Sequence, residues 1–297
     1  MKYCYIAPTS LLSSVRAFER LQSGEEYEQA HLLLAHLLDE QGPDFQPNYR
    51  DFYRTAEGLK ILDNSAFELY KQGRPMFAMD RLIDIGRDIN ADYIVLSDYP
   101  GEPGQHTINA ALELAPAVRQ AGFGTFFVPQ SEVGDKEDYI ETFRWAAKHP
   151  LIDYIGVSIL GVPNAYGVER DNKLQRYLSR AAMMAELASR GILEDVVRNE
   201  KKIHFLGMVD GPKEIELVSK YQIDTWDSSA PVWCGINDIM FDDSPTGLID
   251  GKFEKHVDFS ADYDMIEYDQ RAELLDVVRY NMRVINELVG KANAKAI

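Results

Sequence analysis

The sequence predicts an α/β fold: a (β/α)8 barrel of the TIM type, with insertions and a long C-terminal helix. Short apolar runs alternate with amphipathic segments along the chain, a pattern typical of parallel strands connected by helices. About seven or eight such units in 297 residues suit a closed barrel better than an open sheet. No internal repeat and no linker divides the sequence, so we expect a single domain over residues 1–297.

Each expected strand is an apolar run that ends at small or polar residues. The expected strands are 3–7, 59–62, 93–97, 124–128, 153–159, 203–206 and 223–226. Between them, apolar residues recur at helical spacing. The expected helices are 76–89, 106–120, 135–148, 173–190, 212–220 and 265–291. Pro212 suits a first helical turn. The ranges 40–58 and 235–262 fit neither pattern, and we expect them to be insertions.

Charge limits the classes of partner. The net charge is -17, from 31 basic and 48 acidic residues, which argues against a broad, non-specific nucleic-acid surface. The charge is uneven, however, because residues 170–202 hold eight basic and five acidic side chains. This basic stretch is either a solvated helix face or a local track for phosphates. Arg170, Lys173 and Arg176 are the candidates for phosphate contacts.

Other sequence features point to a cytoplasmic protein. No apolar run approaches the roughly 18 residues that a membrane helix needs, so we expect no membrane partner. The stretch Met1–Pro8 is too short for a signal peptide. Cys4 and Cys234 lie far apart and form no metal motif. We therefore expect neither a metal nor another cofactor.

Polar and small residues follow the predicted strands, and in a barrel of this type the carboxyl ends of the strands carry the chemistry. In chain order these positions are Asp63, Asp98, Gln130, the segment 156–161, Gly207 and Asp227. The alternatives are local: Asp63 and Asp98 fit ordinary turns, and Asp227 fits a helix N-cap. Of the six histidines, only His106 is expected near the rim, more plausibly beside a helix start than in catalysis.

Five segments in this order carry a resemblance to a known family. They are Asp63-Asn64-Ser65-Ala66-Phe67-Glu68, Val95-Leu96-Ser97-Asp98, Gln130, Gly156–Gly161, and Phe205–Pro212 followed by Ile223–Asp227. The set resembles the tRNA-guanine transglycosylase superfamily, whose enzymes exchange guanine for a 7-deazaguanine. The resemblance spans residues 60–235. No single segment is specific, and the order is what carries it.

The sequence departs from the family's tRNA enzymes in two places. Those enzymes carry a zinc site of three Cys and one His, whereas Cys234 is the only cysteine in the C-terminal half of this chain. The loop after Asp227 reads Ser228–Trp233 and lacks the arginine usual in the family. The chain therefore looks like the zinc-free, phage-type DNA guanine transglycosylases. That likeness favours DNA over tRNA as the nucleic-acid partner, with tRNA left as the alternative, and it implies the host cytoplasm as the location if the protein is phage-encoded.

The resemblance also implies roles for individual residues. Asp227 would be the nucleophile that forms a covalent sugar intermediate, and Asp63 would handle the protons. The incoming base would be a 7-deazaguanine such as preQ0 or preQ1. The expected base-binding residues are Asp98, Gln130, Phe67, Val157, Ser158, Leu206 and Gly207. The family's barrels often pair, so a homodimer is one expected arrangement.

Physical reasoning supports these roles and leaves alternatives. A carboxylate beneath the sugar carbon can capture it covalently, and Asp98 suits the N–H edge of a guanine-like base, with Gln130 on the carbonyl side. Phe67 would stack on the base with Leu206 opposite, although both residues also fit a plain core. Two other functions stay open: another carboxylate-based barrel hydrolase or lyase acting on a small substrate, and a non-catalytic subunit of the same fold.

Overall fold

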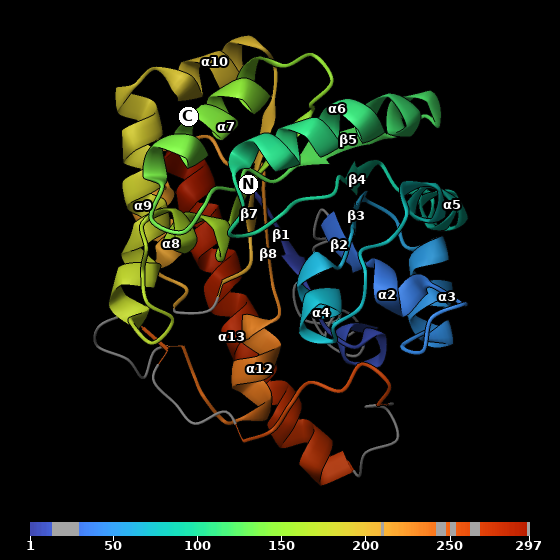
Figure 1. The fold of residues 1–297 in the computed structure, drawn as a ribbon. Coiled ribbons are helices and arrows are strands. Elements are labelled where there is room, and N and C mark those ends of the chain that lie inside the picture. Colours follow the sequence, from blue (N-terminus) through green and yellow to red (C-terminus); the bar gives the residue numbers. More distant parts are fainter. Residues whose placement is uncertain (14–29, 209–210, 242–247, 250–253, 262–267, 296–297) are drawn as a thin grey trace.

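The computed structural model confirms the barrel (Figure 1). It describes the chain except residues 14–29, 209–210, 242–247, 250–253, 262–267 and 296–297. Eight parallel strands form one sheet in the order β1-β8-β7-β6-β5-β4-β3-β2. The two ends of this sheet, β1 and β2, lie next to each other, so the barrel is nearly closed. The strands are β1 (Lys2–Tyr5), β2 (Ala30–Leu34), β3 (Leu59–Asp63), β4 (Tyr93–Val95), β5 (Gly124–Phe127), β6 (Tyr154–Ser158), β7 (Lys202–Leu206) and β8 (Thr225–Ser228).

Helices surround the strands and connect them (Figure 1). They are α2 (Ala35–Leu38), α3 (Pro47–Thr55), α4 (Ala66–Lys71), α5 (Met79–Ile89), α6 (Gly104–Gln120), α7 (Lys136–Lys148), α8 (Gly161–Ala165), α9 (Lys173–Ser189), α10 (Ile192–Arg198), α11 (Glu214–Val218), α12 (Ala230–Ile236) and α13 (Tyr268–Lys295). The long helix α13 packs along α12. Within the described ranges, no helix is both long enough and apolar enough to cross a bilayer.

The second strand of the barrel was not expected from the sequence. β2 has the sequence Ala-His-Leu-Leu-Leu, and all five side chains are buried. Alanine and leucine favour helices, and a short apolar run does not distinguish a strand from a buried helix. Pairing with β3, from Ala30 beside Leu59 to Leu34 beside Asp63, decides the conformation.

The range 40–58, expected as an insertion, contains the regular crossover between β2 and β3. Helix α3 begins at Pro47, in the first helical turn, and buries Tyr49 and Tyr53 against the barrel. Its pattern was too short to be recognised as a barrel helix. The other expected insertion, 235–262, begins at the end of α12 and lies partly outside the described residues.

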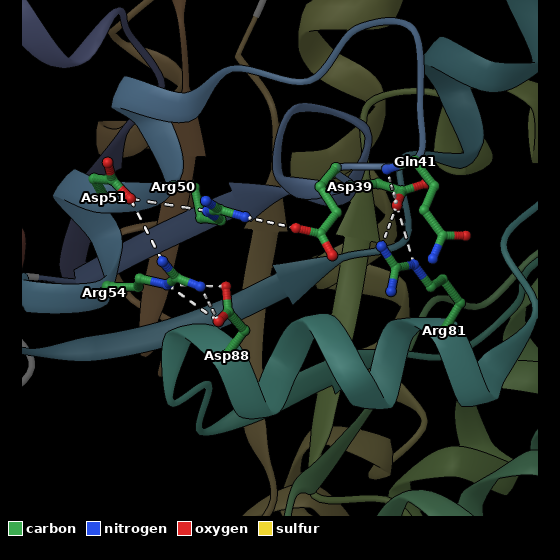
Figure 2. Close-up of polar contacts among 8 residues, drawn as sticks. Asp39, Gln41, Arg50, Asp51, Arg54, Arg81 and Asp88 are labelled. Atoms are coloured by element: carbon green, nitrogen blue, oxygen red, sulfur yellow. Dashed lines mark hydrogen bonds and ion pairs between the residues drawn. The ribbon is translucent and has the colours of Figure 1, made fainter.

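Ion pairs tie α3 and the turn after α2 to α5 (Figure 2). Arg54 of α3 donates from Nε to both carboxylate oxygens of Asp88, at 3.0 and 3.1 Å. Asp39, which follows α2, accepts from Nε and Nη2 of Arg81, at 3.0 and 2.5 Å. Partly exposed ion pairs contribute little to stability. These pairs instead fix how α3 and the turn after α2 lie against α5.

An aspartate precedes each of β4, β6 and β8 and forms the same double hydrogen bond to the preceding strand. Its backbone N–H donates to a carbonyl there, and its carboxylate accepts the N–H of the same residue at 2.8–2.9 Å. The pairs are Asp92 with Lys60, Asp153 with Thr125, and Asp224 with Ile203. The repeated contact sets the register at the amino ends of the strands, opposite the expected site.

Replacing Asp153 by alanine tests this contact. Asp153 also accepts from the hydroxyl of Thr125 at 3.1 Å and from Arg119 at 2.9 Å. We expect the Asp153→Ala variant to lose about 1.5–3 kcal/mol in free energy of unfolding, measured by urea denaturation. Asp84→Ala, which removes an exposed ion pair with Arg87 on α5, should cost less than about 0.5 kcal/mol. Equal losses in the two variants would contradict the register role.

Candidate active site

Asp227 is held at the carboxyl end of β8 by two donors to one oxygen. Its Oδ1 accepts from Nε2 of His204 at 2.7 Å and from the backbone N–H of Gly207 at 3.1 Å. Its other oxygen, Oδ2, accepts no hydrogen bond from the described part of the chain. The side chain of Asp227 is buried within β8, and Ser229 is the N-cap of the following helix. Asp227 is therefore not a helix cap.

Asp63 ends β3 in a half-buried position. Its Oδ2 accepts from the backbone N–H of Ser65 at 3.0 Å, so the turn interpretation of this segment also holds. Burial raises the pKa of Asp63 well above its ordinary value, and the negative charge of Glu68 raises it further. The charges of Asp227 and Asp98 add to the increase in this pKa, so the three expected carboxylates lie within electrostatic reach of one another. Of Asp63 and Asp98, Asp63 therefore holds a proton more readily.

Ser65 holds this corner in a strained conformation. Its φ of 54° is left-handed, which is uncommon for a residue other than glycine. Its hydroxyl lies 3.0 Å from Nδ1 of His36 and accepts the backbone N–H of the same histidine at 3.3 Å. His36 is buried in α2, and this burial lowers its pKa. The strained residue, Ser65, is therefore also the one whose backbone N–H donates to Asp63.

Asp98 is joined to two amides from neighbouring strand ends. Its Oδ1 accepts from Nδ2 of Asn64 at 3.1 Å, and its Oδ2 accepts from Nε2 of Gln130 at 2.7 Å. Burial raises the pKa of Asp98, and these two hydrogen bonds oppose the increase. Asp98 thus bridges the ends of β3, β4 and β5 rather than forming only a local turn.

Gln130 has a buried side-chain oxygen with no hydrogen-bond donor among the residues that the structure describes. Its side chain is buried, and this oxygen is Oε1. A side chain at residue 161 would crowd this oxygen, because its Cβ would lie 2.8 Å away. Glycine at this position keeps the space beside Oε1 open. The expectation had been that the amide of Gln130 would donate to a carbonyl. The amide nitrogen of Gln130 instead donates one hydrogen to Asp98, and the atom still to be satisfied is Oε1, which requires a donor.

A buried arginine supports the ends of β6 and β7. Arg180 of α9 is 1% exposed and forms a bidentate pair with Glu214, at 2.7 and 2.6 Å. It also donates to the carbonyls of Val157 at 3.2 Å, Leu206 at 3.0 Å and Gly207 at 2.8 Å. The carbonyl of Val157, expected to contact a base, is therefore already an acceptor for Arg180.

The peptide between Leu206 and Gly207 links this arginine to Asp227. Its carbonyl accepts from Arg180, and its N–H donates to Asp227 Oδ1. A hydrogen bond at one end of a peptide strengthens the one at the other end. Gly207 has φ +75°, a conformation that favours glycine. Gly207 thus contacts the carboxylate, whereas the sequence had indicated a contact to a base.

The remaining expected residues lie around these carboxylates or at the rim. The hydroxyl of Ser158 accepts from the N–H groups of Leu160 and Gly161, at 3.0 and 3.3 Å. Leu206 is half-buried at the end of β7. Phe67 in α4 is 42% exposed, which argues against a plain core role and leaves its ring accessible.

The expected phosphate contacts lie at the start of α9. Arg170 and Lys173 are exposed, and Arg176 donates to the carbonyl of Arg170. Because α9 follows β6, its first turn lies on the carboxyl side of the barrel. The structure therefore places these cations on the same side as the carboxylates without bringing them into the hydrogen-bonded site.

Two histidines at the site were missed, whereas His106 lies beside a helix start, as expected, in the first turn of α6. His204 lies inside β7, fully buried against Asp227, and His36 supports Ser65. His106 is exposed and pairs with Glu102 at 2.8 Å. The period-2 alternation of β7, which places His204 on the same face as Lys202 and Leu206, was the signal that could have identified it.

The described residues contain no group of three or more His, Cys, Asp or Glu side chains arranged to hold a metal ion. Comparison with known proteins adds no identification: no protein-family model matches the chain, and no curated protein matches its sequence. The functional argument therefore rests on the geometry of the site. Of its three carboxylates, Asp227 has an oxygen that accepts no hydrogen bond from the described residues, Asp63 favours a proton, and Asp98 is bonded to two amides.

The raised pKa of Asp63 makes the stability of the protein depend on pH. The folded state binds this proton more tightly than the unfolded chain, in which the pKa returns to about 4. The contribution of Asp63 to stability is therefore complete below that value and is lost as pH rises through the folded-state pKa. Asparagine does not titrate, so the Asp63→Asn variant should gain stability relative to the wild type as pH rises.

This gain is measured by urea unfolding of both proteins from about pH 4 to about pH 8. Subtracting one curve from the other cancels the titration of the other groups. A difference that stays constant with pH would contradict the raised pKa of Asp63.

Proposed function

We propose that this protein is a guanine transglycosylase. It would exchange guanine in nucleic acid, DNA in preference to tRNA, for a 7-deazaguanine base through a covalent Asp227–sugar intermediate. The observation that carries the proposal is the division among the three carboxylates. Asp227 has one oxygen fixed by two donors, Asp63 has a raised pKa, and Asp98 is joined to amides. Base exchange needs a nucleophile, a proton carrier and a base-binding group, and Asp227, Asp63 and Asp98 suit these roles respectively.

In the first half of the exchange, Oδ2 of Asp227 attacks the anomeric carbon of the sugar. The bond between this carbon and the base nitrogen breaks, and its electron pair leaves with guanine. Asp63 gives its proton to the departing base, which leaves as neutral guanine. The raised pKa of Asp63 fits this step, because the group must be protonated before it can act as an acid.

In the second half, Asp63 acts as a base. Its carboxylate takes a proton from the incoming 7-deazaguanine, and the freed ring nitrogen attacks the sugar carbon. The ester bond to Asp227 breaks and returns the carboxylate to its starting state. Two displacements retain the configuration at the sugar, as in retaining glycosidases. No proton or electron is gained or lost over the cycle.

Recognition of the base would use Asp98 and Gln130. Each carboxylate oxygen of Asp98 accepts one amide hydrogen and has lone-pair capacity for a second donor. The Watson–Crick edge of guanine offers two adjacent donors, N1–H and the 2-amino group. Oε1 of Gln130 can accept a further N–H from the base. Such unmet acceptors reject a base that lacks the matching donors.

The nucleotide would have to leave its stack to reach this site. The accessible ring of Phe67 at the rim can stack on an extruded base. Arg170 and Lys173 at the start of α9 can contact phosphates. These are the features that favour nucleic acid despite the charge of -17.

That same charge favours one alternative, a carboxylate-based hydrolase or lyase acting on a small substrate. An acidic surface repels phosphates, whereas a small neutral substrate is unaffected by it. The two functions differ in a simple binding assay. The transglycosylase should retain DNA at low salt, and the small-molecule enzyme should not.

The proposal predicts that Asp227→Asn loses exchange activity. The measurement is incorporation of radiolabelled guanine into DNA and, in parallel, into tRNA. We expect incorporation to fall by at least about a thousandfold, with the far-UV circular dichroism unchanged. Asp224→Asn is the matched control, because Asp224 lies at the opposite end of the same strand and should retain activity.

Each other outcome has a defined meaning. Label entering tRNA alone would replace DNA as the proposed substrate. Full exchange in Asp227→Asn would overturn the assigned nucleophile. Absence of exchange by the wild type, tested with both guanine and a 7-deazaguanine as the incoming base, would overturn the proposed function.

A further inference from the structure

A continuous hydrogen-bonded chain runs inside the barrel from β6 to Asp227. The hydroxyl of Tyr154 lies 3.0 Å from Oγ1 of Thr225, and this oxygen lies 2.6 Å from Nδ1 of His204. Nε2 of the same imidazole lies 2.7 Å from Oδ1 of Asp227. All four side chains are buried.

The protons available on these four side chains allow the hydrogen bonds to run in only one direction. An ionised Asp227 only accepts, so Nε2 of His204 must carry a hydrogen. In a neutral imidazole Nδ1 then accepts, and its donor is the hydroxyl of Thr225. The single proton of Thr225 is used in this bond, so Oγ1 accepts from the hydroxyl of Tyr154. Each proton in the chain is thereby assigned.

A protonated imidazole would reverse the chain and leave it incomplete. Nδ1 would donate to Thr225, and Thr225 would donate to Tyr154. The proton of Tyr154 would then need another acceptor, and within the described residues its hydroxyl bonds only to Thr225. Burial raises the pKa of Tyr154 well above its ordinary value, so the phenol keeps its proton and remains a donor.

Aromatic packing keeps the imidazole from rotating away. Phe126 stacks on Tyr154, with ring centroids 5.3 Å apart, and meets the ring of His204 edge-on at 5.4 Å. Lys202 lies 5.6 Å from the ring centroid of Tyr154 and donates to the hydroxyl of Tyr93 at 3.0 Å. The hydrogen-bonded chain therefore begins among closely packed side chains below the site.

We infer that Thr225 and Tyr154 are positioning residues that hold His204 as its Nε2–H tautomer, so that Oδ1 of Asp227 stays occupied and Oδ2 is the oxygen that attacks. The catalytic part of this inference rests on the proposed function. The hydrogen-bond part does not, because it concerns the free protein. With the other tautomer, the lone pair of Nε2 would face the carboxylate and repel it.

The test combines nitrogen NMR with steady-state kinetics. The ¹⁵N resonances of the imidazoles distinguish an N–H nitrogen from a bare one, and the His204→Gln variant identifies the signals of His204. We expect the wild type to have a protonated Nε2 and a hydrogen-bonded, unprotonated Nδ1. In Thr225→Val, Nδ1 loses its donor, and its resonance should move downfield.

The kinetic arm uses the same variants. We expect Thr225→Val to lower kcat for base exchange about tenfold, the effect of one lost hydrogen bond on the position of the nucleophile, with KM unchanged. Thr225→Ser keeps the hydroxyl and should restore both kcat and the Nδ1 resonance. Tyr154→Phe should shift the Nδ1 resonance in the same direction as Thr225→Val, by a smaller amount.

The outcomes separate the inference from the proposed function. A wild-type His204 that is protonated at Nδ1 overturns the assigned tautomer. An unchanged kcat in Thr225→Val, or a failure of Thr225→Ser to restore it, overturns the positioning role. Absence of exchange by the wild type overturns the proposed function together with the assignment of Oδ2, while the hydrogen-bond chain is still decided by the nitrogen resonances.

Discussion

A buried guanidinium holds the carboxyl ends of β6 and β7 in place. Arg180 neutralises Glu214 and donates to three backbone carbonyls, which come from both strands and the turn after β7. One of these carbonyls belongs to the peptide whose N–H fixes Asp227. Helix α9, outside the barrel, therefore determines the position of a carboxylate inside it.

The carboxylates differ because their surroundings differ. Asp63 has one backbone donor and neighbouring negative charges, so burial dominates and its pKa rises. Asp98 is buried, but hydrogen bonds from two amides offset part of the increase in its pKa. Asp227 receives an imidazole N–H and a peptide N–H on one oxygen. One residue type thus has three different surroundings, which is how the proposed acid, base-binding and nucleophilic roles would be separated.

The sequence predicted the barrel, and it predicted which polar residues follow the strands, for identifiable reasons. Strands that end in polar residues are visible as local patterns, so the strand-end positions of Asp63, Asp98, Gln130 and Asp227 were predicted. β2 was missed because its alanine and leucines fit a helix equally well and pairing with β3 decided the outcome. His204 and Arg180 were missed as supports because their role depends on which strands are neighbours. A contact across the sheet leaves no local signal in either segment.

The most direct test of the account is detection of a covalent bond between Asp227 and the sugar. The protein is incubated with DNA without an incoming base, denatured rapidly, and digested for mass spectrometry. The account predicts a sugar adduct on the peptide that contains Asp227, absent from Asp227→Asn and discharged when a 7-deazaguanine is added before denaturation. An adduct on Asp63 instead, or base exchange with no adduct under any quench condition, would contradict it.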